Sequence, residues 1–306
     1  MQYPFTEERG ILIKMSSIKL KTKQNLVGWT FVLPASLLIC VFYFYPIGRA
    51  IYLSLQTGIG INMQFVGLMN YKRLFVDKLF KTSLTNVLTY LTFQVPLMLI
   101  LALILAYILN DKNLKLRGFF RVALFLPCAT SLVSYSLIFR SMFALDGFVN
   151  TVLIKLNLLN NPINWLGNPL TAKIVIVLAL TWRWTGYNMI FYLAGLQNID
   201  PSIFEAAVID GANSITRFFK ITLPMLKPII LLTAIISTNG TLQLFDETVN
   251  ITSGGPANAT VSISQYIYRL SFQYSPQFPY AAAMSVFVFL LVAVLALVQM
   301  RVGDQR

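Results

Sequence analysis

The feature that most constrains this chain is a set of six apolar stretches, each long enough to cross a bilayer as a helix. They run roughly over residues 26–48, 83–109, 122–144, 171–195, 228–248 and 281–300, and about 20 apolar residues cross the hydrocarbon. The fifth is the weakest, because polar residues occupy its second half. Only 11% of the residues are charged, whereas a soluble domain carries about 25%. The sequence therefore predicts an all-α, polytopic membrane protein with six transmembrane helices.

The basic residues predict how this protein is oriented, because Lys and Arg favour the cytoplasmic side. With the N-terminus inside, fourteen of them fall in inner segments and seven in outer segments. We therefore expect both termini in the cytoplasm, with residues 1–25 as a cytoplasmic leader and residues 26–306 as the membrane domain. Topology explains the net charge of +13, so no nucleic-acid partner is expected. Four outer basic residues, in 56–82, are expected on an interfacial helix.

Side chains that carry catalysis or bind metals are scarce. The chain has no histidine, which excludes His-based acid–base chemistry, and its two cysteines lie in apolar stretches. Cys40 and Cys128 are expected to be small core hydrophobes. No spacing of ligands indicates a metal site.

A mixed polar and apolar segment, residues 200–224, separates the fourth and fifth stretches. Its first helix starts either with Asp200 as cap and Pro201 at the first position, or with a capping box of Ser202 and Glu205. Gly211 is expected to end that helix, because glycine accepts the left-handed backbone at low cost. In the orientation above, this helix–turn–helix protrudes into the cytoplasm. The alternative is a loop that only connects two spans.

The same segment, "EAAVIDGANSITRFFKITLP", resembles the EAA loop of bacterial ABC-importer permeases. The pattern of that loop is E-A-A, three residues, G, nine residues and I-x-L-P, and every element is present at the family's spacing. The resemblance implies a coupling helix that docks on a separate ATPase subunit. The residues expected to carry this coupling are Glu205, Ala206, Ala207, Asp210, Gly211, Ile221, Leu223 and Pro224.

Further stretches resemble the carbohydrate-uptake branch of that family, which includes maltose, glycerol-phosphate and multiple-sugar permeases. They are "FVLPASLLICVFYFYPIGRAIYLSL", "SISQYIYRLSF" and "TSGGP", the last with Ser253 where the branch has glycine. The resemblance implies a type I ABC importer permease fold, with residues 82–300 as the core permease domain.

The function that the resemblance implies is that of a permease subunit in a binding-protein-dependent ABC importer of the bacterial cytoplasmic membrane. It would form half of the pathway for a sugar or oligosaccharide. Its expected partners are membrane lipid, a second homologous permease, two ATPase subunits and an extracytoplasmic solute-binding protein. The chain has no G-x-x-x-x-G-K-[ST] loop, so we expect a transport subunit without enzyme activity, whose ATPase partners bind the ATP and magnesium. The alternatives are a non-sugar solute such as glycerol phosphate, or a secondary carrier or channel.

The residues expected along the solute pathway are the polar and aromatic ones in the last three spans. Sugars bind to flat aromatic faces together with amides or carboxylates, and both kinds recur at helical spacing in spans four and five. Arg183 is expected either to pair with an acid of span five or to point into the pathway, because a charge within a span is costly. Packing between helices is the alternative role for these side chains. The candidates are Arg183, Trp184, Tyr187, Asn188, Asn239, Gln243, Asp246, Glu247 and Ser285.

Overall fold

The computed structural model describes residues 27–303 apart from 61 and 112, so the expected leader, residues 1–25, lies outside the described residues. The chain forms two units, residues 1–53 and 54–306. The described part of the first unit is an apolar helix beginning at Val27, with a π-helical turn at Cys40–Phe44. Cys40 is exposed on it. The expected core position for this cysteine is wrong, because no residue in the most apolar window of this helix is buried.

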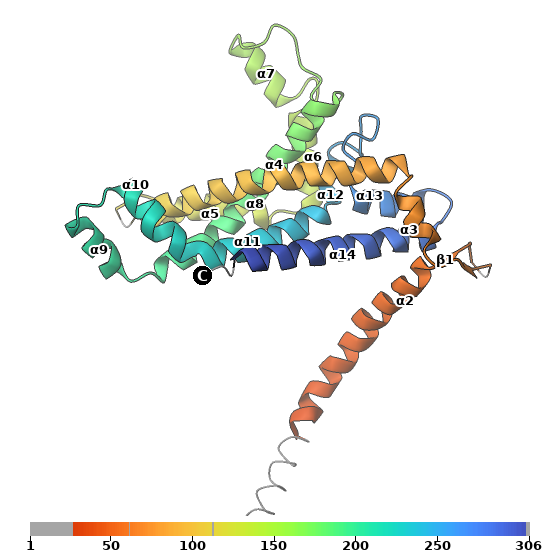
Figure 1. Ribbon diagram of the computed structural model, residues 1–306. Helices are drawn as coiled ribbons and strands as arrows, with labels where there is room; N and C mark the ends of the chain where they lie inside the picture. The colour runs from red at the N-terminus through yellow and green to blue at the C-terminus, as the bar shows by residue number, and fades with distance from the viewer. Residues whose placement is uncertain (1–26, 61, 112, 304–306) are drawn as a thin grey trace, which may run out of the picture. The chain divides into compact units, whose positions relative to one another are not determined.

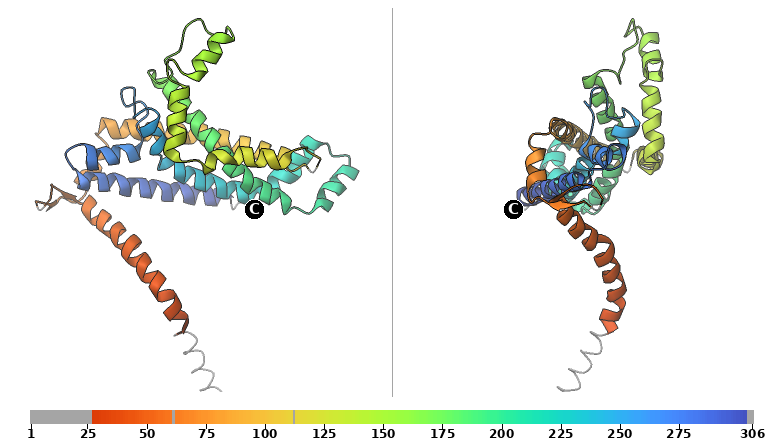
Figure 2. Two further views of the ribbon diagram at one scale, coloured as in Figure 1. Left: turned by 180° about the vertical axis from the view of Figure 1, so that it is seen from behind. Right: turned by 90° about the vertical axis from the view of Figure 1, so that its right-hand side faces the viewer.

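The second unit is a bundle of helices, shown from three sides in Figures 1 and 2. It includes, near its start, a short antiparallel hairpin that the sequence did not predict. From Tyr45 onward the elements are α2 (Tyr45–Ser54), β1 (Gln56–Thr57), β2 (Gln64–Phe65), α3 (Met69–Leu74), α4 (Lys78–Leu109), α5 (Arg117–Ala129), α6 (Leu132–Met142), α7 (Phe148–Lys155), α8 (Pro169–Gln197), α9 (Pro201–Ile209), α10 (Ser214–Arg217), α11 (Leu223–Leu242), α12 (Asp246–Asn250), α13 (Ile263–Tyr268) and α14 (Phe278–Gly303).

Helix α8 is the central helix of this unit. In the most apolar window of α8, 56% of the residues are buried, against 28% or less in the other candidate spans. Two glycines bring its neighbours close: a side chain at Gly186 would collide with the Leu124 carbonyl of α5, and one at Gly195 with Ile229 of α11. Small residues allow membrane helices to approach in this way.

The predicted spans agree with the structure except at two places. Five described helices are long and apolar enough to cross a membrane, and a sixth span exists only if α5 and α6 count as one. These two helices meet at 98°, so the predicted third span, 122–144, is broken. The break follows Pro127, since Thr130 and Ser131 leave the helical conformation.

The predicted fifth span, 228–248, is also wrong at its end. Helix α11 stops at Leu242, and α12 begins a separate short helix at Asp246. Asn239, Gln243, Asp246 and Glu247 therefore do not follow one continuous helix, as their spacing suggested. The polar residues that weakened this stretch mark the place where the helix ends.

Asp77 ties the start of α4 to two distant helices. Its carboxylate accepts the Leu79 and Phe80 backbone N–H groups at 2.8 and 3.1 Å. It also accepts the hydroxyls of Tyr266 in α13 and Tyr280 in α14, both at 2.7 Å. The neighbouring α3 carries Lys72 and Arg73, so a helix does lie where the sequence predicted an interfacial one.

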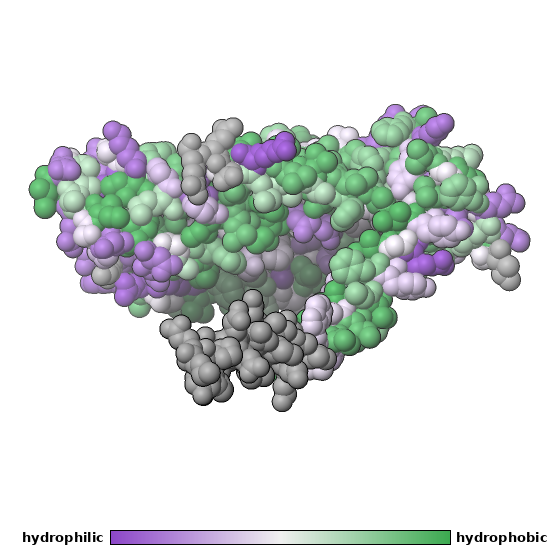
Figure 3. Space-filling model, turned by 60° about the horizontal axis from the view of Figure 1, so that its bottom comes forward, coloured by the Kyte–Doolittle hydropathy of each residue, from purple (hydrophilic) through white to green (hydrophobic). Residues whose placement is uncertain are grey.

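The surface of this unit is apolar over most of its length. In Figure 3, hydrophobic side chains cover much of the middle of the face shown, and hydrophilic ones gather toward both ends, at the left over α9 and α10. Such a distribution is typical of a protein whose middle faces lipid and whose end faces water.

Candidate functional site

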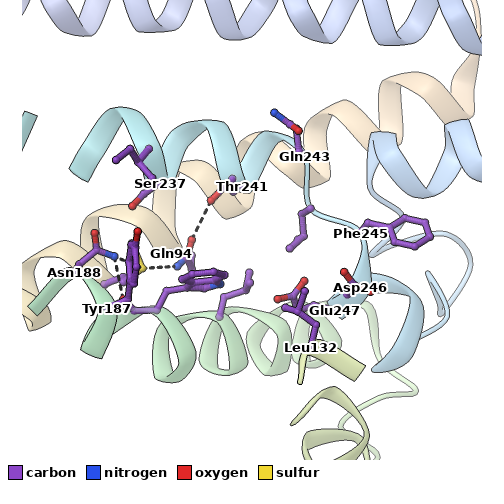
Figure 4. A pocket seen from close by; sticks show the side chains of 16 residues that line it. Gln94, Leu132, Tyr187, Asn188, Ser237, Thr241, Gln243, Phe245, Asp246 and Glu247 are labelled. Atoms are coloured by element: carbon purple, nitrogen blue, oxygen red, sulfur yellow. Dashed lines mark hydrogen bonds between the residues drawn. The ribbon is translucent and has the colours of Figure 1, made fainter. Parts of the chain in front are cut away.

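A cavity of about 350 Å³ lies between helices α4, α8 and α11, near the start of α12 (Figure 4). Its walls are mostly apolar, with a few polar groups, which is typical of small-molecule sites. The sequence predicted six of its lining residues: Trp184, Tyr187, Asn188, Gln243, Asp246 and Glu247. The lining residues are Gln94, Met98, Leu132, Leu180, Trp184, Tyr187, Asn188, Ile236, Ser237, Gly240, Thr241, Gln243, Leu244, Phe245, Asp246 and Glu247.

Amides from two helices form one polar side of the cavity. Gln94 donates to the Met98 sulfur at 3.3 Å and accepts from the Thr241 hydroxyl at 3.4 Å. Asn188 donates to the Trp184 carbonyl at 3.0 Å, while its own Oδ1 is buried without a partner. An unsatisfied buried acceptor favours a ligand that brings a donor.

Two aromatic rings of α8 form the wall opposite α11. Trp184 and Tyr187 both line the cavity and meet edge to face at 5.7 Å between centroids. Phe191 extends the row, 5.1 Å from Tyr187. The predicted aromatic face of this helix therefore lies at the cavity.

Two adjacent carboxylates lie at the end of the cavity where α12 begins. Figure 4 shows Asp246 and Glu247 beside each other, with Glu247 on the side of Leu132. Glu247 is buried, and the Tyr135 hydroxyl of α6 donates to its Oε1. That hydrogen bond fixes the orientation of the Glu247 side chain and joins α6 to α12 through two residues that are 112 apart in sequence.

Arg183 does not line the cavity and does not pair directly with a described acid. Its two terminal nitrogens donate to the Pro127 and Cys128 carbonyls, each at 3.2 Å, and a third bond reaches Thr130. The guanidinium also lies 4.6 Å from the Tyr135 ring centre. Arg183 therefore caps the end of α5 at the break, together with Thr130, whose N–H and hydroxyl also donate to the Pro127 carbonyl. This differs from both arrangements that the sequence suggested.

Two other expected pathway residues, Asn239 and Ser285, do not line the cavity, and Gln243 lines it with its amide turned outward. The Gln243 amide donates to Asn239 Oδ1 and turns away from the other labelled side chains in Figure 4. Asn239 is exposed, as is Ser285 of α14, which donates to the Ala281 carbonyl at 3.1 Å.

Sequence reasoning missed the contribution of α4 to the cavity. Gln94 and Met98 reach it from a span that seemed purely structural. Gln94 is the one amide in the apolar stretch from Leu91 to Leu105, and that exception was the available indication. Ser237 and Thr241 of α11 were also missed.

The α9–α10 hairpin, residues 200–217, is closed by local hydrogen bonds. Asp200 rather than Ser202 caps α9, accepting the Ser202 N–H at 2.9 Å. That backbone N–H holds the pKa of the exposed Asp200 below its ordinary value. Gly211 has a φ of +77°, and the N–H groups of Gly211 and Ala212 bond back to Val208 and Ala207. This is the Schellman ending that favours glycine, so the predicted turn is confirmed.

The second half of the hairpin is anchored to the end of α4. Asn213 caps α10 through the Thr216 N–H at 2.8 Å. Tyr107 of α4 hydrogen-bonds the Ser214 hydroxyl at 3.0 Å and meets the Phe218 ring at 5.1 Å. A π-helical turn, Phe218–Thr222, then leads into α11, and the hairpin is thus joined to the bundle without a flexible linker.

Apolar side chains are exposed on this hairpin. Ile209 is 86% exposed, and Val208 and Ile215 are also exposed. A shallow groove between α9 and α10 is lined by Phe204, Glu205, Val208, Ile209 and Arg217. Of the other matched residues, Ala206, Asp210, Gly211 and Pro224 are exposed, and Ala207, Ile221 and Leu223 are half-buried. Exposed apolar groups rimmed by charge indicate a protein-binding surface.

Comparison with known proteins places this chain among transport proteins. Residues 112–304 match the family described as "Binding-protein-dependent transport system inner membrane component". The chain is 52% identical to the lactose transport system permease protein LacF of Rhizobium radiobacter over 293 residues, covering 95% of this chain and 98% of the relative. It is 34% identical to the arabinooligosaccharides transport system permease protein AraP of Bacillus subtilis (strain 168), covering 90% and 88%.

The fold is shared with a solved importer. A crystal structure of a bacterial ABC transporter involved in the import of the acidic polysaccharide alginate superposes with a TM-score of 0.82 at 22% identity. The match covers 94% of this chain and 99% of that one. The predicted all-helical importer-permease fold is thereby confirmed.

Proposed function

Because the chain belongs to the binding-protein-dependent transport system inner membrane component family, we propose that it forms half of the translocation pathway of an ABC importer for a sugar or oligosaccharide. The cavity carries this proposal, since it offers an aromatic wall, buried amides and two carboxylates within one space. Sugars bind through stacking of their C–H faces on aromatic rings and through hydrogen bonds from their hydroxyls. The sugars named for the relatives at 52% and 34% identity support the same class of cargo.

A second homologous permease completes the pathway in this proposal. Asn239, Gln243 and Ser285 are polar and exposed on helices α11 and α14 or at their ends. Polar side chains on membrane helices usually face another helix or a water-filled space rather than lipid. We assign these three to the surface that meets the second permease.

The importer has two separate ATPase subunits, one for each permease. The α9–α10 hairpin is the surface of this chain that contacts one of them. Its exposed apolar residues and groove suit docking, and its caps and its anchor on Tyr107 suit transmission of a displacement. The distribution of basic residues supports a cytoplasmic place for the hairpin and for both termini. ATP binds those partner subunits; their closure then moves the hairpin and shifts the preferred opening of the pathway. No ATPase activity or cofactor of this chain itself is part of the proposal, and an extracytoplasmic binding protein delivers the sugar.

Uptake by the complete importer in proteoliposomes tests the proposal, with labelled lactose as the first probe. Trp184→Ala should reduce ATP-dependent lactose uptake by about tenfold or more, because an aromatic wall is lost. Trp29→Ala is the control: this tryptophan is exposed on the apolar helix that begins at Val27 and does not line the cavity, so its loss should change uptake much less. Equal uptake by the two variants would contradict the cavity as the sugar site. Lactose transport without the ATPase subunits would contradict the importer.

A further inference from the structure

The charge of the cavity lining is one-sided. Among the sixteen lining residues, Asp246 and Glu247 are the only ionisable acids, and none is Lys or Arg. Both carboxylates belong to the first turn of α12 and stand together at one end of the cavity (Figure 4). A ligand that fills the cavity therefore meets the half-buried carboxylate of Asp246, with the buried Glu247 beside it, and no cation within the lining.

The nearest cation is occupied elsewhere. Arg183 is 5% exposed, and its terminal nitrogens donate to Pro127, Cys128 and Thr130 at the end of α5. To bind an anion in the cavity it would have to abandon these three bonds and leave the Cys128 carbonyl without this donor. An anionic ligand therefore gains no hydrogen bond from Arg183 in this arrangement, and the guanidinium lies behind the Trp184 and Tyr135 rings rather than in the cavity.

The hydrogen-bonding groups point to the same class of ligand. The side-chain amides of Gln94, Asn188 and Gln243 each already donate within the protein. The oxygen of Asn188 is buried and unpaired, and the two carboxylates are acceptors. Such a lining suits a ligand rich in hydroxyl donors, whereas a ligand carboxylate supplies acceptors only.

Glu247 is held in place for this role by a residue outside the cavity. The Tyr135 hydroxyl donates to it, and Tyr135 in turn lies against the Arg183 guanidinium. Tyr135 acts as a positioning residue, because its hydroxyl holds one oxygen of Glu247. The other oxygen of Glu247 and both oxygens of Asp246 accept no hydrogen bond from Tyr135.

We propose that Asp246 and Glu247 make this cavity selective for neutral, hydroxyl-rich sugars against sugars that carry a carboxylate. The inference rests on the proposed sugar pathway and adds the charge class of the cargo. The shared fold does not decide this point, since the alginate importer with a TM-score of 0.82 takes an acidic polysaccharide. Specificity of this kind comes from a repulsive element as well as an attractive one.

The test measures binding to the permease–ATPase complex without the binding protein, whose own preference would otherwise contribute. The probes are lactose and its analogue with a carboxylate at C6 of galactose, so that the pair differs in one group. The readout is the ligand-dependent rise in melting temperature, which gives an apparent Kd. Wild type should bind lactose at least about tenfold more tightly than the carboxylate analogue, as like charges repel at short range.

The informative variant is Asp246→Asn/Glu247→Gln. It should weaken lactose binding and strengthen binding of the analogue, so that the ratio of the two Kd values falls by about tenfold. Asp111→Asn/Asp146→Asn removes the same charge at exposed positions and should leave the ratio as in wild type. Should the double variant fail to fold, Asp246→Asn alone, at a half-buried position, is expected to shift the ratio in the same direction.

The outcomes separate the two proposals. If the ratio of the two Kd values were unchanged in the double variant, or if the variant bound both ligands equally less tightly, the charge selectivity would be overturned. The carboxylates would then have a structural role. Tight binding of the carboxylate analogue by wild type would overturn it as well. Failure of wild type to bind either probe would instead contradict the sugar cavity itself, and with it the inference.

Discussion

The α9–α10 hairpin and the cavity are built in opposite ways. The hairpin is determined by neighbours in sequence: Asp200 caps its first helix, Gly211 ends it and Asn213 caps the next. The cavity is assembled from α4, α8, α11 and α12, and the hydrogen bond between Gln94 and Thr241 joins residues 147 apart. Local determination gives a rigid surface that can be recognised by its pattern, whereas distant assembly allows the lining to vary while the fold stays constant.

The largest loss of stability should come from substitution of Arg183, whose role depends wholly on contacts with residues distant in sequence. Arg183→Met would remove three hydrogen bonds from the end of α5, leaving the Cys128 carbonyl without this donor and the Pro127 carbonyl with Thr130 alone, and should lower the stability of the complex by about 2–4 kcal/mol. Melting of the purified complex in detergent measures this loss. Arg140→Met, at an exposed position on α6, is the matched control. A melting temperature equal to that of the control would show that the α5 cap contributes nothing.

A smaller effect, confined to the local region, is expected at Gly211. Gly211→Val places a β-branched residue at a φ of +77° and should strain the turn by about 1–3 kcal/mol. We expect the variant to reach the membrane with normal amounts of its partners but to transport sugar poorly while ATP hydrolysis continues. Gly211→Asn should retain much more transport, because asparagine tolerates this conformation. Normal coupled transport by the valine variant would argue against the hairpin as the coupling element.

The smallest effect should come from Asp77, which combines a local cap with two distant bonds. Burial raises its pKa, but the Tyr266 and Tyr280 hydroxyls and the Phe80 and Leu79 N–H groups outweigh burial, so the pKa lies below its ordinary value. A depressed pKa contributes stability that is present above the pKa of the unfolded chain and is lost as the pH falls through the folded value.

The measurement at Asp77 is melting temperature against pH. Wild type should lose stability as the pH falls below about 4, whereas Asp77→Asn should start less stable by under about 1 kcal/mol and change less over that range. Asp146→Asn, at an exposed site, should follow the wild-type profile. If Asp77→Asn lost as much stability at low pH as the wild type does, the Asp77 carboxylate would not be the source of that loss.

The same contrast explains how far the sequence could predict the structure. Spans of apolar residues and the cap and turn residues of the hairpin act within one or two helical turns, so the helical fold and Gly211 were predictable. The end of α11 at Leu242 and the break after Ala129 were not, because both depend on what lies opposite. The polar stretch after Leu242 is satisfied only when α12 packs beside α6, and the break is stabilised by Arg183, 53 residues beyond Thr130.

The cavity was predictable only in part for a related reason. Aromatic spacing on α8 identified Trp184 and Tyr187, since both belong to one helix face. Nothing local distinguishes a helix face that borders a space from one that packs against a neighbour, so Arg183 was placed at the pathway and Gln94 was not. A lone amide in an otherwise apolar span is worth examining for this reason.

The bend between α5 and α6 has a mechanical consequence. One guanidinium clamps the last turn of α5 while its own backbone belongs to α8, next to Trp184. The elbow and the aromatic wall therefore travel together, and a tilt of the central helix is carried to α6 and, through Tyr135, to the acidic corner. In the proposed importer, opening of the pathway and a change in the shape of the solute cavity would then occur in one motion.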